Sequence, residues 1–191
     1  MTVLLGNLFY MDKKNERDFY VLKEEYKRFI EACPYQYELF WKVIFNAGLR
    51  ISEGLLISKN DVLSDENKII INTLKRKNHP KIPVIISHDL IKEIEQYVLD
   101  NNITDRLWNF SRQYAWKIFK SIGKKAGLNP RYSPHSFRHG HGLMIADITN
   151  GDVMRIKDRL RHASLKSTEY YLHISEQKQK ELSNKIEEYL K

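Results

Sequence analysis

The stretch SPHSFRHGHG at residues 133–142 gathers three imidazoles around one arginine. Two chemistries suit such a group, metal binding by the imidazoles or binding of an anion such as a phosphate. On a helix, His135 and Arg138 share a face because they are three residues apart. His139 shares part of that face, whereas His141 lies nearer the opposite side and is expected to pack or to lie on the surface.

The neighbouring arginine decides between the two chemistries. A zinc site prefers paired histidines backed by a third ligand, and the sequence has no His-Glu-x-x-His pattern. Arg138 would repel a cation, but its guanidinium fork matches phosphate oxygens, to which His135 adds a hydrogen-bond donor or a base. The motif therefore favours an anion site, and no metal is predicted.

Three other segments carry residues with chemical potential. In NAGLRISEGLLI, Arg50 lies between apolar residues, where a charge needs an anionic partner. Glu53, three residues on, offers a purely structural pairing for it. In the turn LKRKNHPK, Lys75 and Lys77 are either solvated turn lysines or proton donors that reach a cleft.

The segment LRHASLKSTEYYLHI brings a histidine and a tyrosine close together. His162 ends one predicted helix and Tyr171 follows nine residues later. A phenol can attack phosphorus if the phosphate charge is neutralised. Most tyrosines in helical apolar surroundings only fill the core, and this is the expectation for Tyr170.

The elements that must position these residues are mostly helices. Apolar residues recur at helical spacing in 20–33 and 34–48, and again in segments beginning near 52, 87, 111, 133, 152, 164 and 175. Two β-rich runs, NKIIINTL and KIPVII, predict an antiparallel hairpin around the turn at 75–80. Pro80 and Pro83 limit the second strand to an edge or a short ladder. The sequence predicts a mainly α fold with a small antiparallel β-sheet.

The bulk composition fits a folded, nucleic-acid-binding domain. The chain has 191 residues, 42% of them hydrophobic, and a net charge of +8. Residues 110–166 hold twelve Lys/Arg against three Asp/Glu, which is typical of a surface for phosphate backbones, although a solvated cationic face has the same signature. Cys33 is the only cysteine, which indicates a reducing compartment, and no apolar run reaches the roughly 18 residues of a transmembrane helix.

In chain order these residues match a known catalytic set. The phrases GLRISEGLLI, TLKRKNHPKIPV, SRQYAWKIFKSIGKKAGL, SPHSFRHG and RLRHASLKSTEYYLHI resemble the tyrosine recombinases, or phage integrase family, over roughly residues 20–175. The resemblance implies a family fold, no metal or ATP, and the catalytic residues Arg50, Lys75, His135, Arg138, His162 and Tyr171.

The resemblance also implies a role for each group. Arg50 and Arg138 would hold the non-bridging oxygens of a scissile phosphate, with His162 as a further donor. His135 would assist as a base or hydrogen-bond partner. Lys75, at the family's spacing before Pro83, would protonate the departing 5′ hydroxyl.

Tyr171, at the family's step from His162, would form a 3′-phosphotyrosyl link. The sequence departs from the family pattern at Phe137, where leucine is more usual, and at Arg161, where a small residue, often glycine, is usual. Arg161 is expected to bind backbone phosphate or to be exposed. Arg112 and Lys117, in SRQYAWKIFK, are the other candidate DNA contacts.

The expected organisation is an N-terminal extension (1–20), a catalytic domain (21–174) and a helical tail (175–191) that packs in cis or docks on a neighbouring protomer. The chain is either a catalytic fragment or a compact single-domain member. Its expected partners are double-stranded DNA and further copies of itself, as a tetramer on DNA and a monomer in isolation. The expected location is the cytoplasm of a bacterium or archaeon, or the chain belongs to a viral element, and no membrane association is expected. Two alternatives stay open: a type IB topoisomerase-like enzyme and a catalytically silent DNA-binding relative.

Overall fold

A computed structural model describes residues 20–73, 80–162, 164, 168, 183–184 and 186–188 of the chain. The helices are α2 (Lys23–Glu31), α3 (Tyr35–Asn46), α4 (Ile51–Gly54), α5 (His88–Asp100), α6 (Arg112–Lys125), α7 (Pro134–Ile148) and α8 (Val153–Arg159). The strands are β1 (Val62–Leu63), β2 (Lys68–Asn72) and β3 (Lys81–Ile85), with short 3₁₀ turns at Lys59–Asp61 and Ser64–Glu66. This confirms the predicted mainly α fold with a small antiparallel sheet.

The helices form where the apolar periodicity predicts them, and local signals set their ends. Ser87 and Ser111 cap α5 and α6 by accepting hydrogen bonds from the main-chain N–H groups of Leu90 and Tyr114. Gly48 and Gly127 follow α3 and α6 with positive φ angles, the usual ending of a helix at a glycine. Pro34 lies just outside α3, at its N-cap.

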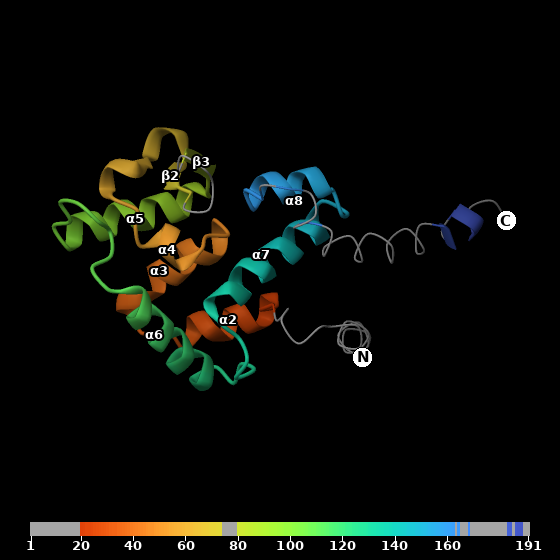
Figure 1. Cartoon of the computed structure of the whole chain (residues 1–191), viewed down its shortest axis with the longest axis horizontal. Coiled ribbons are helices and arrows are strands. Elements are labelled where there is room, and N and C mark those ends of the chain that lie inside the picture. Colours follow the sequence, from red (N-terminus) through yellow and green to blue (C-terminus); the bar gives the residue numbers. More distant parts are fainter. Residues whose placement is uncertain are drawn as a thin grey trace.

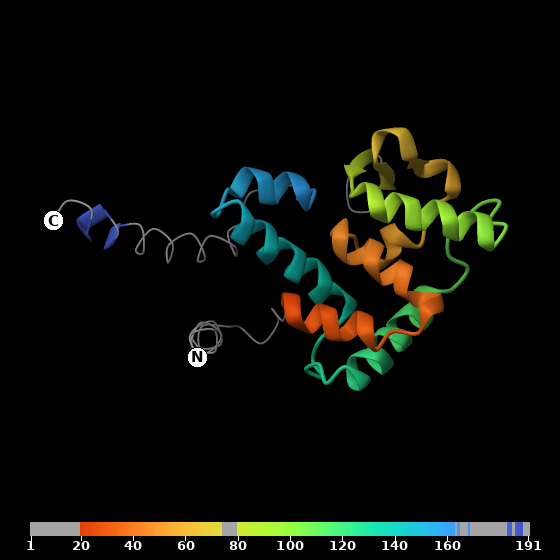
Figure 2. The same cartoon turned by 180° about the vertical axis from the view of Figure 1, so that it is seen from behind.

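An aromatic core holds the helices together. Figure 2 shows α2 packed between α6 and α7. Phe137 of α7 is fully buried, with its ring centroid 4.7 Å from that of Phe29 and 5.1 Å from that of Phe119. Trp41 of α3 joins the same cluster. Because Phe137 anchors α7, the position of its neighbour Arg138 is fixed by the core.

The sheet has the order β1-β2-β3, and both pairings are antiparallel. Ile69 and Ile71 of β2 face the core, as the alternating pattern predicts. β3 is an edge strand, in agreement with the two prolines, and Pro83 pairs with Ile70. The predicted hairpin is confirmed as β2 and β3, and the two-residue strand β1, which was not predicted, adds a third strand.

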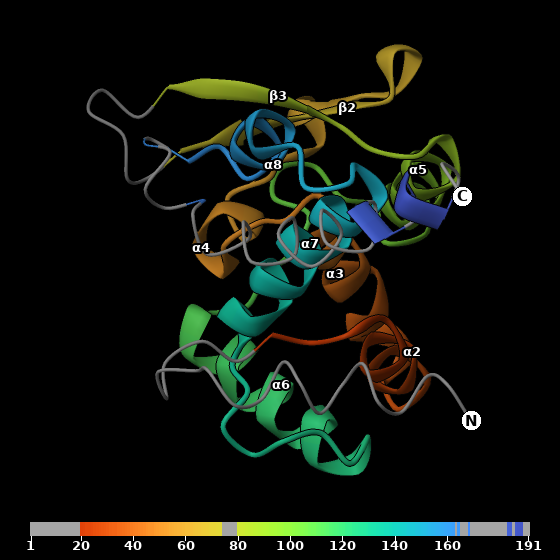
Figure 3. The ribbon, with the colours of Figure 1, turned by 90° about the vertical axis from the view of Figure 1, so that its right-hand side faces the viewer.

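The sheet lies at one end of the molecule and α6 at the other. Figure 1 shows α7 running obliquely between them, and Figure 3 shows α8 beside β2 and β3. Arg159, the last residue of α8, donates hydrogen bonds to the main-chain carbonyls of Ile85 in β3 and Asn46 in α3. Within 20–73 and 80–162, none of the helices combines the length and apolar character needed to cross a bilayer.

Candidate active site

The site is built where the turn between α3 and α4 meets α7 and the end of α8. Arg50 is the N-cap of α4, and Glu53 closes the first turn of this helix. Nη1 of Arg50 lies 2.6 Å from Oε1 of Glu53, and the main-chain N–H of Arg50 donates a hydrogen bond to Oε2 of Glu53. The structural pairing considered from the sequence is therefore present, and it holds Arg50 in place with its side chain 23% exposed.

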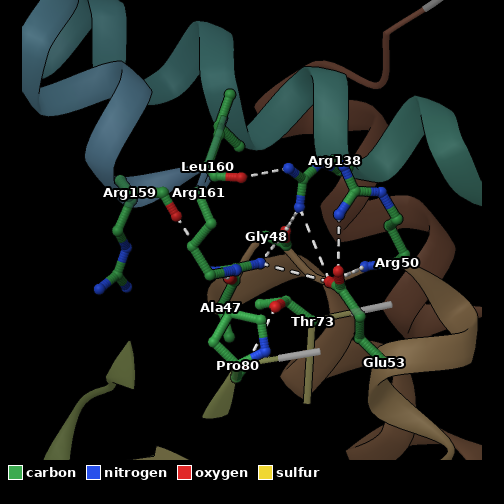
Figure 4. A network of polar contacts seen from close by, with 10 residues as sticks. All are labelled: Ala47, Gly48, Arg50, Glu53, Thr73, Pro80, Arg138, Arg159, Leu160 and Arg161. Atoms are coloured by element: carbon green, nitrogen blue, oxygen red, sulfur yellow. Dashed lines mark hydrogen bonds and ion pairs between the residues drawn. The ribbon is translucent and has the colours of Figure 1, made fainter. Parts of the chain in front are cut away.

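Arg138 and Arg161 approach the same acceptors from α7 and from the segment after α8 (Figure 4). The carbonyl oxygen of Gly48 accepts hydrogen bonds from Nη1 of Arg138 at 2.6 Å and from Nη2 of Arg161 at 2.8 Å. Oε2 of Glu53 lies 3.9 Å from the first nitrogen and 3.6 Å from the second. Arg138 also donates to the carbonyl of Leu160.

Glu53 is the carboxylate that these cations surround. Burial raises its pKa, but the backbone hydrogen bond from Arg50 and the charges of Arg161, Arg50 and Arg138 outweigh burial and lower the pKa below its usual value. Three guanidinium groups around one ionised carboxylate leave the cluster with excess positive charge. Such a cluster can bind an anion.

His162 lies beside this cluster. Its Nδ1 is 3.1 Å from the hydroxyl oxygen of Thr168, a fully buried turn residue. Burial, together with the charges of Arg138, Arg50 and Arg161, lowers the pKa of His162 to about 4. At neutral pH the imidazole is therefore uncharged, and one ring nitrogen can donate a hydrogen bond while the other accepts one.

The three histidines of residues 133–142 lie on the sides of α7 that the helical spacing predicts. His135 is exposed near the start of α7, and its ring packs edge-on against that of His139, with centroids 4.6 Å apart. His141 is buried, which confirms the packing expectation. Among the described residues, no cluster of three or more His, Cys, Asp or Glu side chains is suited to a metal ion.

Several predicted residues lie elsewhere. Lys75 and Tyr171 fall outside the described residues. Thr73 and Pro80, on either side of the segment that contains Lys75, are described: both the main-chain N–H and the hydroxyl of Thr73 donate to the carbonyl of Pro80. Arg112 and Lys117 are exposed on α6, which contributes no residue to the arginine cluster.

Arg161 differs from its expectation. It was expected to bind DNA backbone or to be exposed, but its side chain is only 3% exposed, and its guanidinium donates to carbonyls of the protein. The reason is the return of the chain after α8, which directs residue 161 inward towards the end of α3. Its guanidinium therefore points towards main-chain carbonyls of the protein and not towards the solvent.

Sequence reasoning also missed two contributors. The first is Gly48, whose carbonyl is an acceptor for two guanidinium groups. The glycine itself was the available signal, because a glycine at a helix end commonly takes a positive φ, which is 57° here. Thr168, the partner of His162, carried no signal, because its role depends on a contact between two side chains.

The chain matches the phage integrase family over residues 20–178. It is 30% identical over 151 residues to the tyrosine recombinase XerA of Pyrococcus horikoshii, covering 72% of this chain and 50% of that protein. The fold is similar to that of the XerH recombinase bound to its palindromic difH substrate in a post-cleavage complex, with a TM-score of 0.74, 19% identity, and coverage of 87% and 53%.

It is also similar to the catalytic domain of bacteriophage HP1 integrase, with a TM-score of 0.66, 18% identity, and coverage of 82% and 88%. The chain spans about half the length of the curated relatives that it matches. The family match covers most of the chain, and Arg50, Arg138 and His162 lie together within it. This chain belongs to the phage integrase family.

Proposed function

We propose that this chain is the catalytic domain of a site-specific DNA recombinase or integrase, which cuts and rejoins DNA strands through a 3′-phosphotyrosyl intermediate. The observation that carries the proposal is the convergence of Arg50 and Arg138 on one buried carboxylate, with a neutral His162 close to these two arginines. These groups come from three separate parts of the chain, and together they suit one phosphodiester. The excess positive charge of the site complements the negative charge on the phosphate oxygens during phosphoryl transfer.

The reaction balances without a cofactor. The phenol oxygen of Tyr171 attacks phosphorus and forms a P–O bond, while the bond from phosphorus to the 5′ oxygen breaks. His135 accepts the phenolic proton and Lys75 protonates the departing 5′ oxygen. Because one phosphate ester replaces another, a 5′ hydroxyl of a second strand can reverse the step and join the strands without ATP. The guanidinium groups supply the charge stabilisation that a metal ion supplies in other phosphoryl-transfer enzymes.

DNA is the proposed partner, with several copies of the chain on it. The net charge of +8 and the basic segment 110–166 support attraction to a phosphate backbone. XerH, which has a similar fold, is bound to its difH substrate. A tetramer on DNA and docking of the tail 175–191 on a neighbouring protomer belong to the same proposal. The curated relatives are recombinases, and nothing favours the topoisomerase-like alternative.

The test does not need a known target sequence. The purified chain is mixed with a pool of nicked duplexes of random sequence, in which the nick lets the cleaved strand leave and traps the adduct. Adducts that survive denaturing detergent are isolated and their DNA is sequenced. The wild type is expected to yield adducts enriched in one sequence, Tyr171→Phe none, and the matched control Tyr170→Phe a normal yield.

Two results would count against the proposal. A wild type that forms no adduct from any duplex would favour the catalytically silent relative. Adducts that persist in Tyr171→Phe but vanish in Tyr170→Phe would move the nucleophile by one residue. A matched pair, Lys75→Ala and Lys77→Ala, tests the proton donor, because a substrate with a 5′ thiol leaving group needs no protonation and should restore cleavage only to the impaired lysine variant.

A further inference from the structure

Arg161 has an unusual place for an arginine. It stands between α8 and His162 with a φ of 54°, in the left-handed region that glycine adopts freely and L side chains adopt rarely. Its side chain is nonetheless buried, and burial lowers its pKa to about 10, so that it stays charged at neutral pH. A buried charge on a disfavoured backbone persists only where surrounding contacts compensate for it.

Most side-chain contacts of Arg161 lead to the turn that carries Arg50 and to its partner Glu53. Nη1 donates to the carbonyls of Ala47 at 3.1 Å and Arg159 at 3.0 Å, and Nη2 donates to Gly48 at 2.8 Å. Nη2 also lies 3.6 Å from Oε2 of Glu53. One planar group thus joins the end of α3, the carboxylate that holds Arg50, and the segment that carries His162 (Figure 4).

Arg138 depends on the same acceptors. Its Nη1 shares the Gly48 carbonyl with Arg161 and lies 3.9 Å from Glu53. If Arg161 were absent, Arg138 would be the one guanidinium left at the Gly48 carbonyl and beside Oε2 of Glu53. Its guanidinium would then be drawn further towards the protein and away from a phosphate.

We propose that Arg161 is a positioning residue, which fastens the Gly48–Arg50 turn and Glu53 to the segment bearing His162 so that Arg50, Arg138 and His162 face one phosphate, without touching DNA itself. The inference rests on the proposed function of the site. It replaces the DNA-contact role expected from the sequence, and the two roles predict different results. A DNA contact contributes to affinity and to its salt dependence, whereas a positioning residue contributes to the rate of cleavage.

Two substitutions separate charge from shape. Arg161→Gly fits the positive φ and removes both charge and hydrogen bonds. Arg161→Lys keeps the charge, but an ammonium group cannot reproduce the planar fork that reaches several carbonyls at once. Arg155→Gln removes an exposed arginine of α8, with a side chain 73% exposed, and serves as the matched control.

The first readout is the titration of His162 by NMR, which needs no DNA. The pKa of His162 is expected to rise above about 4 in Arg161→Gly, because one of the charges that lower it is lost while burial and the charges of Arg138 and Arg50 remain. It is expected to stay near 4 in Arg161→Lys and in Arg155→Gln. An unchanged His162 in Arg161→Gly would mean that Arg161 does not lie against the site.

The second readout is single-turnover cleavage of a duplex recovered from the random pool, with DNA affinity measured in parallel. At saturating DNA, cleavage is expected to fall about tenfold or more in both Arg161 variants. The DNA concentration for half saturation and its salt dependence should stay unchanged. Because Arg161→Lys keeps the charge, slow cleavage in this variant would identify the fork as the cause.

Two outcomes would overturn the proposal. Full cleavage in both variants would show that Arg161 positions nothing, and weaker DNA binding with a lower salt slope would restore the DNA-contact role. If Arg161→Gly fails to fold, as judged by circular dichroism, Arg161→Lys decides between the two roles. If the wild type itself forms no adduct, the proposed function fails, while the His162 titration still decides whether Arg161 holds the site.

Discussion

The imidazole of His141 lies directly against the α-carbon of Gly48, so that a β-carbon at residue 48 would come within 2.5 Å of Cδ2 of the ring. Gly48 also has a φ of 57°, which an L side chain rarely adopts. We therefore expect Gly48→Ala to lower the free energy of unfolding by about 2 kcal/mol or more, since it combines a steric clash with backbone strain. Urea denaturation measures this loss.

A reference variant and a double variant divide this loss into its parts. Gly127 has a similar φ of 66° but open space around the position of a β-carbon, so Gly127→Ala reports the strain alone. Adding His141→Ala to Gly48→Ala should relieve the clash but not the strain. If Gly48→Ala is no worse than Gly127→Ala, the contact with His141 has no energetic importance.

Removing the charge of Glu53 should damage both the stability and the chemistry of the site. We expect Glu53→Gln to lower the free energy of unfolding by about 3 kcal/mol, because it leaves buried guanidinium groups without their carboxylate. Cleavage should be lost in the same variant. Glu66→Gln removes an exposed carboxylate paired with Lys68 and should change stability by less than about 1 kcal/mol. Equal melting temperatures for both variants would contradict this account.

Acid should destabilise the protein through His141. Burial, with the charges of Arg159, Arg161 and Arg138, lowers the pKa of His141 to about 3 from an ordinary 6.5. Between these values the unfolded chain binds a proton that the folded protein excludes. The free energy of unfolding therefore falls as the pH falls from 6.5 towards 3, by at most about 1.4 kcal/mol for each pH unit.

The aromatic variant His141→Phe should flatten this pH dependence, because it keeps a ring and removes the proton-binding site. Thermal denaturation at several pH values measures the slope. His88→Gln, which replaces an exposed histidine, is the matched control. A slope that is the same in His141→Phe and in the wild type would assign the acid sensitivity to other groups, such as Glu53.

Gly140 of α7 should not tolerate a side chain, because a β-carbon there would overlap the main-chain carbonyl of Val21. This close crossing is also held by a hydrogen bond from the N–H of Val21 to the carbonyl of Ser136. Gly140→Ala is expected to lower the melting temperature. Gly123→Ala, in α6 with only ordinary contacts, should raise stability by about 0.5 to 1 kcal/mol through better helix propensity. If Gly140→Ala and Gly123→Ala change the stability in the same direction, the close contact between Gly140 and Val21 has no energetic importance.

The exposed cations of α6 are predicted to contact DNA backbone. Replacing Arg112 or Lys117 by alanine should lower the slope of log affinity against log salt by about one for each residue, measured on a duplex of arbitrary sequence. Lys92→Ala removes an exposed charge from α5 and should leave the slope unchanged. Unchanged slopes for Arg112 and Lys117 would place the DNA on another face.

Much of the fold could be predicted because local patterns agree with the tertiary structure. The apolar periodicity of α3 and α6, the caps at Ser87 and Ser111, and the glycine endings are all local signals. β1 could not be predicted, since Val62–Leu63 is too short for any alternation. It exists because β2 offers it a hydrogen-bonding edge.

The site was predictable in its parts and less so in its geometry. The resemblance identified Arg50, Arg138 and His162, and the structure brings these three residues together. The burial of Arg161 was not predictable, because a charged residue in a basic segment looks like any surface cation. Its inward direction depends on where the chain turns after α8 and on carbonyls more than a hundred residues away in sequence.

Pro83 in the middle of β3 has a consequence for how copies of the protein meet. An edge strand can pair with strands of other molecules, and the side chain of Ile85, which is 60% exposed, adds apolar surface to this edge. The missing N–H of Pro83 interrupts any ladder that a second molecule would add. Copies of the protein that meet at high concentration are thus protected from aggregating through their sheet edges.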